Sequence, residues 1–146
     1  MAILIDTNIL LRLLQPHHPH FPLVERALVT LRMRNEPLNI MPQNLMEFWA
    51  VATRPTSENG LGMTVENAAG ELASMKRVFT LLAETASVYQ EWERLVLEHQ
   101  VSGKNSHDAH IVAAMNIYGI TRILTFNVQD FARYSGISAV NPADVG

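Results

Sequence analysis

Three acidic residues stand where the sequence could support metal chemistry. Asp6 directly follows the aliphatic run 2–5, Glu47 follows the short apolar run 38–41, and Asp108 opens a strongly helical stretch. Carboxylates that lie close together repel each other, so a cluster of them stays ionised most easily around a cation. Oxygen ligands in a chain without cysteine favour Mg²⁺ or Mn²⁺. Such an ion can activate a water for attack on a phosphodiester.

Each acid also has an ordinary explanation when it is taken alone. Asp6 or Thr7 could simply cap a helix that begins near Asn8, and Glu47 could be a solvated helix acid. Asp108 is harder to explain in this way, because its spacing places it on the apolar face of its helix. A buried acid is costly unless it is compensated. The N-terminus of the helix provides part of that compensation, and a cation provides more.

Further polar residues are candidates for the same edge of the fold. Asn127 and Asp130 follow the aliphatic stretch 120–125 and can offer oxygens toward it. Arg54 begins a loop rich in Gly, Pro, Asn and Ser, and Lys104 follows Gly103. Loops at such an edge often contact the substrate. We therefore expect these two cations to be candidates for phosphate binding.

The elements that must position these residues alternate along the chain. Short aliphatic runs predict strands at 2–5, 38–41, 78–82, 120–125 and 137–140, and periodic stretches predict helices at 8–14, 21–34, 42–53, 64–77, 85–99, 106–118 and 132–135. This alternation predicts a single α/β domain over residues 1–146, with a parallel sheet covered on both faces. Parallel sheets bind ligands beyond the carboxyl ends of their strands. The candidate acids are expected to meet there.

The composition of the chain indicates the class of protein and its location, but it does not identify a substrate. Hydrophobic residues make up 48% and charged residues 17% of the 146 residues, which is typical of a globular domain. The absence of cysteine, of a signal-peptide pattern and of a long apolar run predicts a cytoplasmic protein with no membrane segment. The net charge of −3 argues against non-specific nucleic-acid binding by the whole surface, although it permits a local basic patch.

Four motifs in order resemble those of PIN-domain ribonucleases, especially the VapC-type toxins of bacterial toxin–antitoxin pairs. They are Ile-Asp-Thr-Asn-Ile-Leu at 5–10, Glu-Phe-Trp-Ala-Val at 47–51, His-Asp-Ala-His-Ile-Val-Ala-Ala at 107–114 and Leu-Thr-Phe-Asn-Val-Gln-Asp-Phe at 124–131. The resemblance covers nearly the whole chain. It implies a PIN fold, a three-layer α/β/α arrangement around a central parallel sheet of about four to five strands. It also implies Mg²⁺- or Mn²⁺-dependent endoribonuclease activity, a homodimer, and inhibition by a small antitoxin whose tail enters the active site.

The resemblance also assigns roles to individual residues. Asp6 and Asp108 would be direct metal ligands, and Glu47 would be a ligand directly or through a water that it positions for attack. The family often has a fourth acid where this chain has Asn127, so either Asn127 or the nearby Asp130 could take that place. Three further residues would hold the carboxylates by hydrogen bonding, namely Thr7, Asn8 and Thr125.

Two other functions fit parts of the same sequence. A phosphatase of the haloacid dehalogenase type also begins with an aliphatic strand that ends in Asp. That chemistry requires a second acid two residues later and a late lysine, whereas this chain has Asn8 and no lysine after Lys104. A non-catalytic PIN-like module that binds RNA or protein is the other alternative, and the Asn127 substitution leaves room for it.

Overall fold

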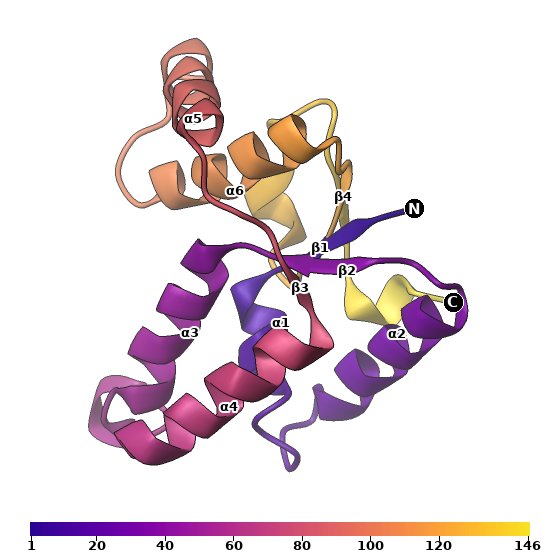
Figure 1. Cartoon of the computed structure of the whole chain (residues 1–146), viewed down its shortest axis with the longest axis vertical. Coiled ribbons are helices and arrows are strands. Elements are labelled where there is room, and N and C mark those ends of the chain that lie inside the picture. Colours follow the sequence, from indigo (N-terminus) through magenta and orange to yellow (C-terminus); the bar gives the residue numbers. More distant parts are fainter.

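Five parallel strands form one central sheet in the computed structural model, which describes residues 1–146 (Figure 1). The strand order is β3-β2-β1-β4-β5, and every neighbouring pair is parallel. The strands are β1 (Ile3–Ile5), β2 (Leu38–Ile40), β3 (Thr80–Leu81), β4 (Arg122–Leu124) and β5 (Ser138–Val140). The sequence prediction of a parallel sheet of four to five strands is confirmed.

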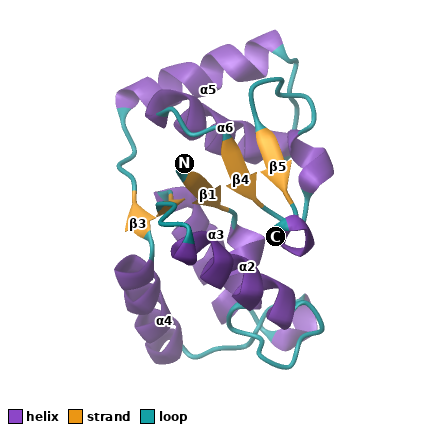
Figure 2. Cartoon of the chain, turned by 90° about the vertical axis from the view of Figure 1, so that its right-hand side faces the viewer, coloured by secondary structure: helices purple, strands orange, loops and turns teal.

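Six helices cover the two faces of this sheet. Figure 2 shows α5 and α6 on one side of the strands and α2, α3 and α4 on the other. Their bounds are α1 (Thr7–Arg12), α2 (Phe21–Met33), α3 (Pro42–Thr53), α4 (Val65–Val78), α5 (Ala86–Glu98) and α6 (Asn105–Tyr118). None of these helices is long and apolar enough to cross a membrane.

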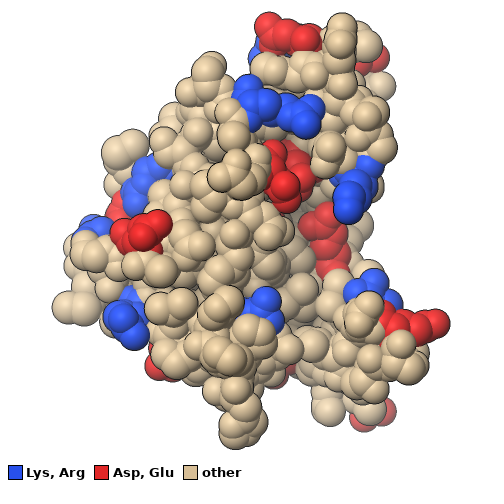
Figure 3. All heavy atoms as spheres, turned by 180° about the vertical axis from the view of Figure 1, so that it is seen from behind, with Lys and Arg blue, Asp and Glu red and all other residues tan.

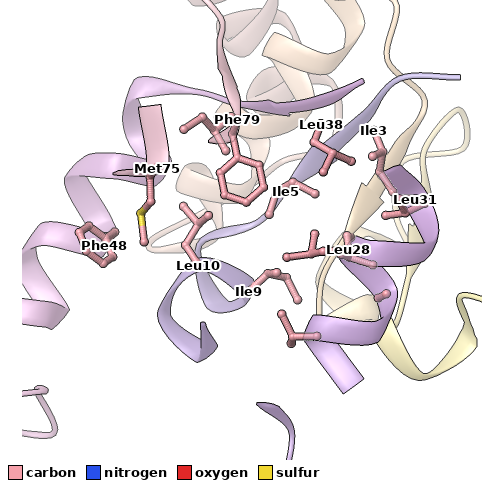
Figure 4. Packing of buried hydrophobic residues seen from close by; sticks show 14 of the residues in the cluster. Ile3, Ile5, Ile9, Leu10, Leu28, Leu31, Leu38, Phe48, Met75 and Phe79 are labelled. Carbon is pink, nitrogen blue, oxygen red and sulfur yellow. The ribbon is translucent and has the colours of Figure 1, made fainter. Parts of the chain in front are cut away.

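Two hydrophobic cores fix the helices to the sheet. Successive residues of a strand point to opposite faces, so Ile3 and Ile5 of β1 pack into one core while Leu4 packs into the other. The first core joins the strands to α1–α4, and Figure 4 shows Phe48 beside Met75, with Leu10 between this pair and Ile5 of β1. The second core joins them to α5 and α6. A strand buried on both faces explains why its sequence is uniformly aliphatic.

The order of the strands places the carboxyl end of β1 at the centre of the molecule. β2 pairs with one side of β1 and β4 pairs with the other, so the chain reverses direction across the sheet at this point. Such reversals leave a crevice beyond the strand ends. The backbone N–H of Asp6 donates to the carbonyl of Leu124 over 3.0 Å, which ties the ends of β1 and β4 together.

Two predicted elements differ from the structure. The strand expected at 78–82 is reduced to Thr80–Leu81, because α4 continues as far as Val78. The helix expected at 132–135 is absent, and a 3₁₀ helix at Val128–Phe131 stands before it. The buried Phe131 anchors this turn in the second core. Tertiary packing therefore sets the position of the turn more strongly than the local sequence does.

Candidate active site

Asp6 ends β1 and begins α1, and its carboxylate is tied on both oxygens. Oδ1 accepts from the backbone N–H of Thr7 at 2.8 Å. Oδ2 accepts from the Thr125 hydroxyl at 2.8 Å and from Asn8 Nδ2 at 3.4 Å. Asp6 is thus the N-cap residue of α1, as the ordinary explanation expects, and it also faces the other candidate residues. Capping and a role in a site are compatible here.

Glu47 is held by donors from two different helices. The Thr7 hydroxyl donates to its Oε1 at 2.7 Å, and Gln43 Nε2 donates to its Oε2 at 3.1 Å. Thr7 Oγ1 in turn accepts from Asn44 Nδ2 at 3.2 Å, so the hydroxyl proton is free to be given to Glu47. The Glu47 carboxylate is therefore fixed in orientation on both oxygens.

Asp108 lies in the first turn of α6, and its pKa is raised to about 6. Burial is the largest cause, and the negative charges of Asp6, Asp130 and Glu47 add to it, while His107 acts in the opposite direction. Burial also raises the pKa of Asp6, although its hydrogen bonds to Thr125 and Thr7 oppose the change. The acids feel one another's charge, as expected for a cluster.

These acids line a common cleft of about 380 Å³ beyond the carboxyl end of the sheet. The lining residues are Asp6, Thr7, Asn8, Leu11, Glu47, Ala50, Val51, Asp108 and Asn127. Asn127 therefore reaches the cleft. Asp130 does not line it, and acts on the site through its charge.

Arg54 and Lys104 lie outside the cleft lining. Both side chains are exposed. Arg54 is the C-cap residue of α3, and its Nη2 donates to the carbonyl of Asn59 at 3.3 Å within the same loop. Lys104 immediately precedes α6, the helix that carries Asp108. If these cations bind the substrate, they contact it on the exposed surface outside the cleft.

Sequence reasoning missed two residues that adjoin the site, Gln43 and Glu84. Gln43 is only 8% exposed and contacts Glu47, the backbone of α6 and His110. His110 also pairs with Glu84, with 2.9 Å between Nε2 and Oε2. The position of Gln43 four residues before Glu47 on one helix was a usable signal, because residues at this spacing are neighbours. Nothing in the sequence pointed to Glu84.

The donor set fits a hard divalent cation, although no three acidic or histidine side chains are grouped closely enough to form a ready metal site as they stand. Asp6, Glu47 and Asp108 provide carboxylate oxygens in one cleft, and Asn127 provides a neutral oxygen. Burial raises the pKa values of Asp6 and Asp108, the charges of neighbouring acids add to this, and a bound cation would oppose both effects. Oxygen-only donors are suited to Mg²⁺ or Mn²⁺.

Comparison with known proteins assigns the fold. The PIN domain family matches residues 3–137, nearly the whole chain. The chain belongs to the PIN-domain family. Among curated proteins, none matches it in sequence. The PIN assignment also removes support from the phosphatase alternative.

Solved structures similar to this PIN domain include VapC-type toxins and their complexes. VapBC2 from Rickettsia felis, bound to a DNA fragment of its promoter, has 17% identity and a TM-score of 0.71, with 97% of this chain and 98% of that chain covered. VapBC-1 from Haemophilus influenzae has 15% identity and a TM-score of 0.72, with 99% and 100% covered. VapC20 from Mycobacterium tuberculosis, a toxin that cleaves the sarcin–ricin loop, has 22% identity and a TM-score of 0.66, with 90% and 95% covered. At these identities the likeness is one of fold.

Proposed function

We propose that this PIN domain is a Mg²⁺- or Mn²⁺-dependent endoribonuclease, and the toxin of a toxin–antitoxin pair. The observation that carries the proposal is the joint placement of Asp6, Glu47 and Asp108 in one cleft at the strand ends, with the pKa values of both aspartates raised. Membership of the PIN family and the VapC-like fold support it. Clustered carboxylates without a cysteine or serine nucleophile are suited to hydrolysis by a metal-activated water.

The residues divide the work according to their contacts. Asp6 and Asp108 would hold the cation, which supplies charge stabilisation and an acidified water when bound. Glu47 would orient the attacking water and accept its proton, since hydrogen bonds to both oxygens fix its carboxylate. Asn127, in the place of a fourth acid, would offer a neutral oxygen. This set favours one strongly held cation.

The raised pKa of Asp108 couples metal binding to pH. A group with a pKa of about 6 is partly protonated near neutrality, so a cation must displace a proton to bind there. Metal affinity is therefore expected to rise with pH through this region. Cleavage at low metal concentration should follow the same trend.

The RNA would meet a surface of mixed charge. Figure 3 shows acidic side chains in a recess on one face, with Lys and Arg side chains around it. Arg54 and Lys104 are exposed cations on the elements that lead into and away from the site residues. We assign them to phosphate contacts outside the cleft, where they would guide the strand without neutralising the catalytic acids.

A protein partner would fit beside the site. An apolar groove of about 420 Å³ runs along α3, which also carries Glu47, and is lined by Pro42, Leu45, Met46, Trp49, Leu72, Lys76 and Leu81. Met46 is 64% exposed there. Apolar surface of this kind supports binding of another protein. We assign this groove to a small antitoxin whose tail enters the cleft. We further propose that the protein is a homodimer and that the assembly is cytoplasmic.

Cleavage of a mixed RNA pool tests the enzymatic proposal. Purified protein is incubated with Mg²⁺, Mn²⁺ or EDTA, in parallel with Asp6→Asn and Asp108→Asn. Cleavage that requires the metal and is lost in both variants would support the proposal. Equal cleavage by the wild type and both variants would identify a contaminating nuclease. A wild type that neither cleaves RNA nor binds Mn²⁺ in calorimetry would instead support a non-catalytic binding module.

A further inference from the structure

A chain of side chains leads from Glu47 to the protein surface through Gln43. Gln43 lies in the first turn of α3 and is 8% exposed. Its Nε2 donates to Glu47 Oε2 at 3.1 Å and to the carbonyl of His107 at 3.0 Å. One amide group thus links the helix that carries Glu47 to the helix that carries Asp108. Burial makes a partnerless amide costly, so these bonds are strongly favoured.

The orientation of the Gln43 amide is fixed by its partners. Both groups on the Nε2 side are acceptors, a carboxylate and a backbone carbonyl. A flipped amide would place its oxygen against both of them. The Gln43 Oε1 atom must therefore face His110 Nδ1, and this ring nitrogen must carry a hydrogen because the amide oxygen can only accept.

His110 is held in turn from its outer side. Its Nε2 lies 2.9 Å from Oε2 of Glu84, which belongs to the segment between β3 and α5. His110 is half-buried, with 23% of its side chain exposed, and Glu84 is 41% exposed. The histidine ring therefore has a partner on each nitrogen, and both partners lie outside the cleft lining. Both partners are acceptors, so the ring is anchored on both sides when each of its nitrogens carries a hydrogen.

We propose that Gln43 is the positioning residue for Glu47, and that His110, anchored by Glu84, holds the Gln43 amide in the required orientation. Its catalytic consequence rests on the proposed nuclease function. Gln43 does not line the cleft, and acts through the Glu47 carboxylate. Together with Thr7 it fixes both oxygens of Glu47, so that the carboxylate points into the cleft in one orientation. Mutation of a residue that hydrogen-bonds to a metal-site side chain typically lowers metal affinity or activity about 10- to 100-fold.

The variant that isolates this role is Gln43→Met, which preserves side-chain size and removes both hydrogen-bonding groups. We expect kcat for RNA cleavage to fall about 10- to 100-fold, with Mn²⁺ affinity weakened in calorimetry and KM for RNA little changed. His110→Ala should cause a smaller loss of the same kind. The melting temperature without metal shows whether each variant is folded.

A double variant tests whether His110 acts through Gln43. If it does, adding His110→Ala to Gln43→Met should change kcat no further, so the two effects are not additive. His99→Ala is a matched control. His99 has 29% side-chain exposure and lies 3.6 Å from Glu98, but neither His99 nor Tyr134, on which it packs, lines the cleft. This control should retain wild-type kcat, KM and Mn²⁺ affinity.

Nitrogen-15 NMR of the Gln43 side-chain amide tests, in metal-free protein and independently of cleavage, whether His110 holds this amide in one orientation. We expect a dispersed resonance with slow hydrogen exchange, which moves in His110→Ala and stays in place in His99→Ala. A resonance at the position of a free glutamine, exchanging rapidly, would overturn the proposal. Wild-type kcat in Gln43→Met would also overturn it. Failure of the wild type to cleave RNA would refute the nuclease function. The NMR result would still decide whether His110 holds the Gln43 amide in place.

Discussion

The hydroxyl of Thr125 lies 2.8 Å from Oδ2 of Asp6 and joins the carboxyl ends of β4 and β1. The Thr125 hydroxyl oxygen, Oγ1, also accepts from Asn8 Nδ2 at 3.2 Å and from the backbone N–H of Asn127 at 3.0 Å. Its acceptor capacity is therefore used, and its single proton is committed to Asp6. Thr125 is fully buried. One side chain thus sets the orientation of the central carboxylate and the start of the Asn127 turn.

Replacing Thr125 with Val should weaken both stability and metal binding. The substitution removes a donor to a carboxylate whose pKa burial already raises, so the pKa of Asp6 should rise further. We expect a loss of about 1–3 kcal/mol in the free energy of unfolding and about 10- to 100-fold in Mn²⁺ affinity. Urea unfolding and calorimetry measure the two effects. Thr125→Ser retains the hydroxyl and should preserve most of the affinity; an equal loss in both variants would show that the hydroxyl is not responsible.

Removing the Asp108 charge should stabilise the metal-free protein at neutral pH. Because its pKa is about 6 in the folded state against an ordinary value of 3.8, the folded protein binds more protons than the unfolded chain between about pH 4 and pH 6. The contribution of Asp108 to stability therefore falls as pH rises through that window. After discounting for partial exposure, Asp108→Asn should gain about 1–2 kcal/mol at pH 7 in EDTA.

Thermal unfolding at several pH values checks this expectation. The melting temperature of Asp108→Asn should exceed that of the wild type at pH 7 by roughly 2–8 °C, and the difference should shrink toward pH 4. Added Mn²⁺ should stabilise the wild type more than the variant, because only a protein that binds the ion gains from it. A difference that is the same at every pH would assign the effect to packing.

Asn127→Asp tests the position of the fourth acid. Asn127 lines the cleft, so an aspartate there would add a charged ligand beside Asp6 and Asp108. We expect tighter Mn²⁺ binding, and lower stability in EDTA because like charges are brought together. Asp130→Asn is the matched comparison, since Asp130 acts through charge without lining the cleft. It should lower the pKa of Asp108 and leave kcat within a few-fold; an abolished kcat would make Asp130 a ligand.

Arg54→Ala with Lys104→Ala should affect RNA binding and spare the metal site. Both side chains are exposed and lie outside the cleft lining. We expect KM for RNA to rise, with Mn²⁺ affinity unchanged. For single-stranded RNA, the slope of log affinity against log salt should decrease by about 0.7 for each phosphate contact that is lost. Unchanged KM and salt slope would exclude both residues from the RNA-binding surface.

The local composition of the chain was enough to predict the fold class. Aliphatic runs such as 2–5 are buried on both faces of a parallel sheet, and only such a position favours an uninterrupted apolar strand. Helix ends were also encoded locally. Thr64 accepts from the N–H of Asn67, and Gly119 adopts φ +69° at the end of α6, as the sequence signals for caps indicate.

A general rule for parallel sheets predicts that the acids converge. It does not predict which residues bind to them. Residues that follow parallel strands or open the helices beside them gather at one edge, so the meeting of Asp6, Glu47 and Asp108 could be inferred without coordinates. The start of the 3₁₀ turn at Val128 could not, because the burial of Phe131 determines it. The extent of β3 likewise depends on where α4 ends.

The sequence by itself therefore determined the sheet, the edge of the sheet and the acids that meet there. Only the tertiary structure decided which neutral side chains hold those acids, and which polar residue reaches the cleft. Thr125 and Asp6 are 119 residues apart, and Gln43 and His110 are 67 apart. Such contacts depend on the relative placement of whole helices and strands, which is set by packing in the two cores. Hydrogen bonds are short and directional, so a small change in that packing would give different partners.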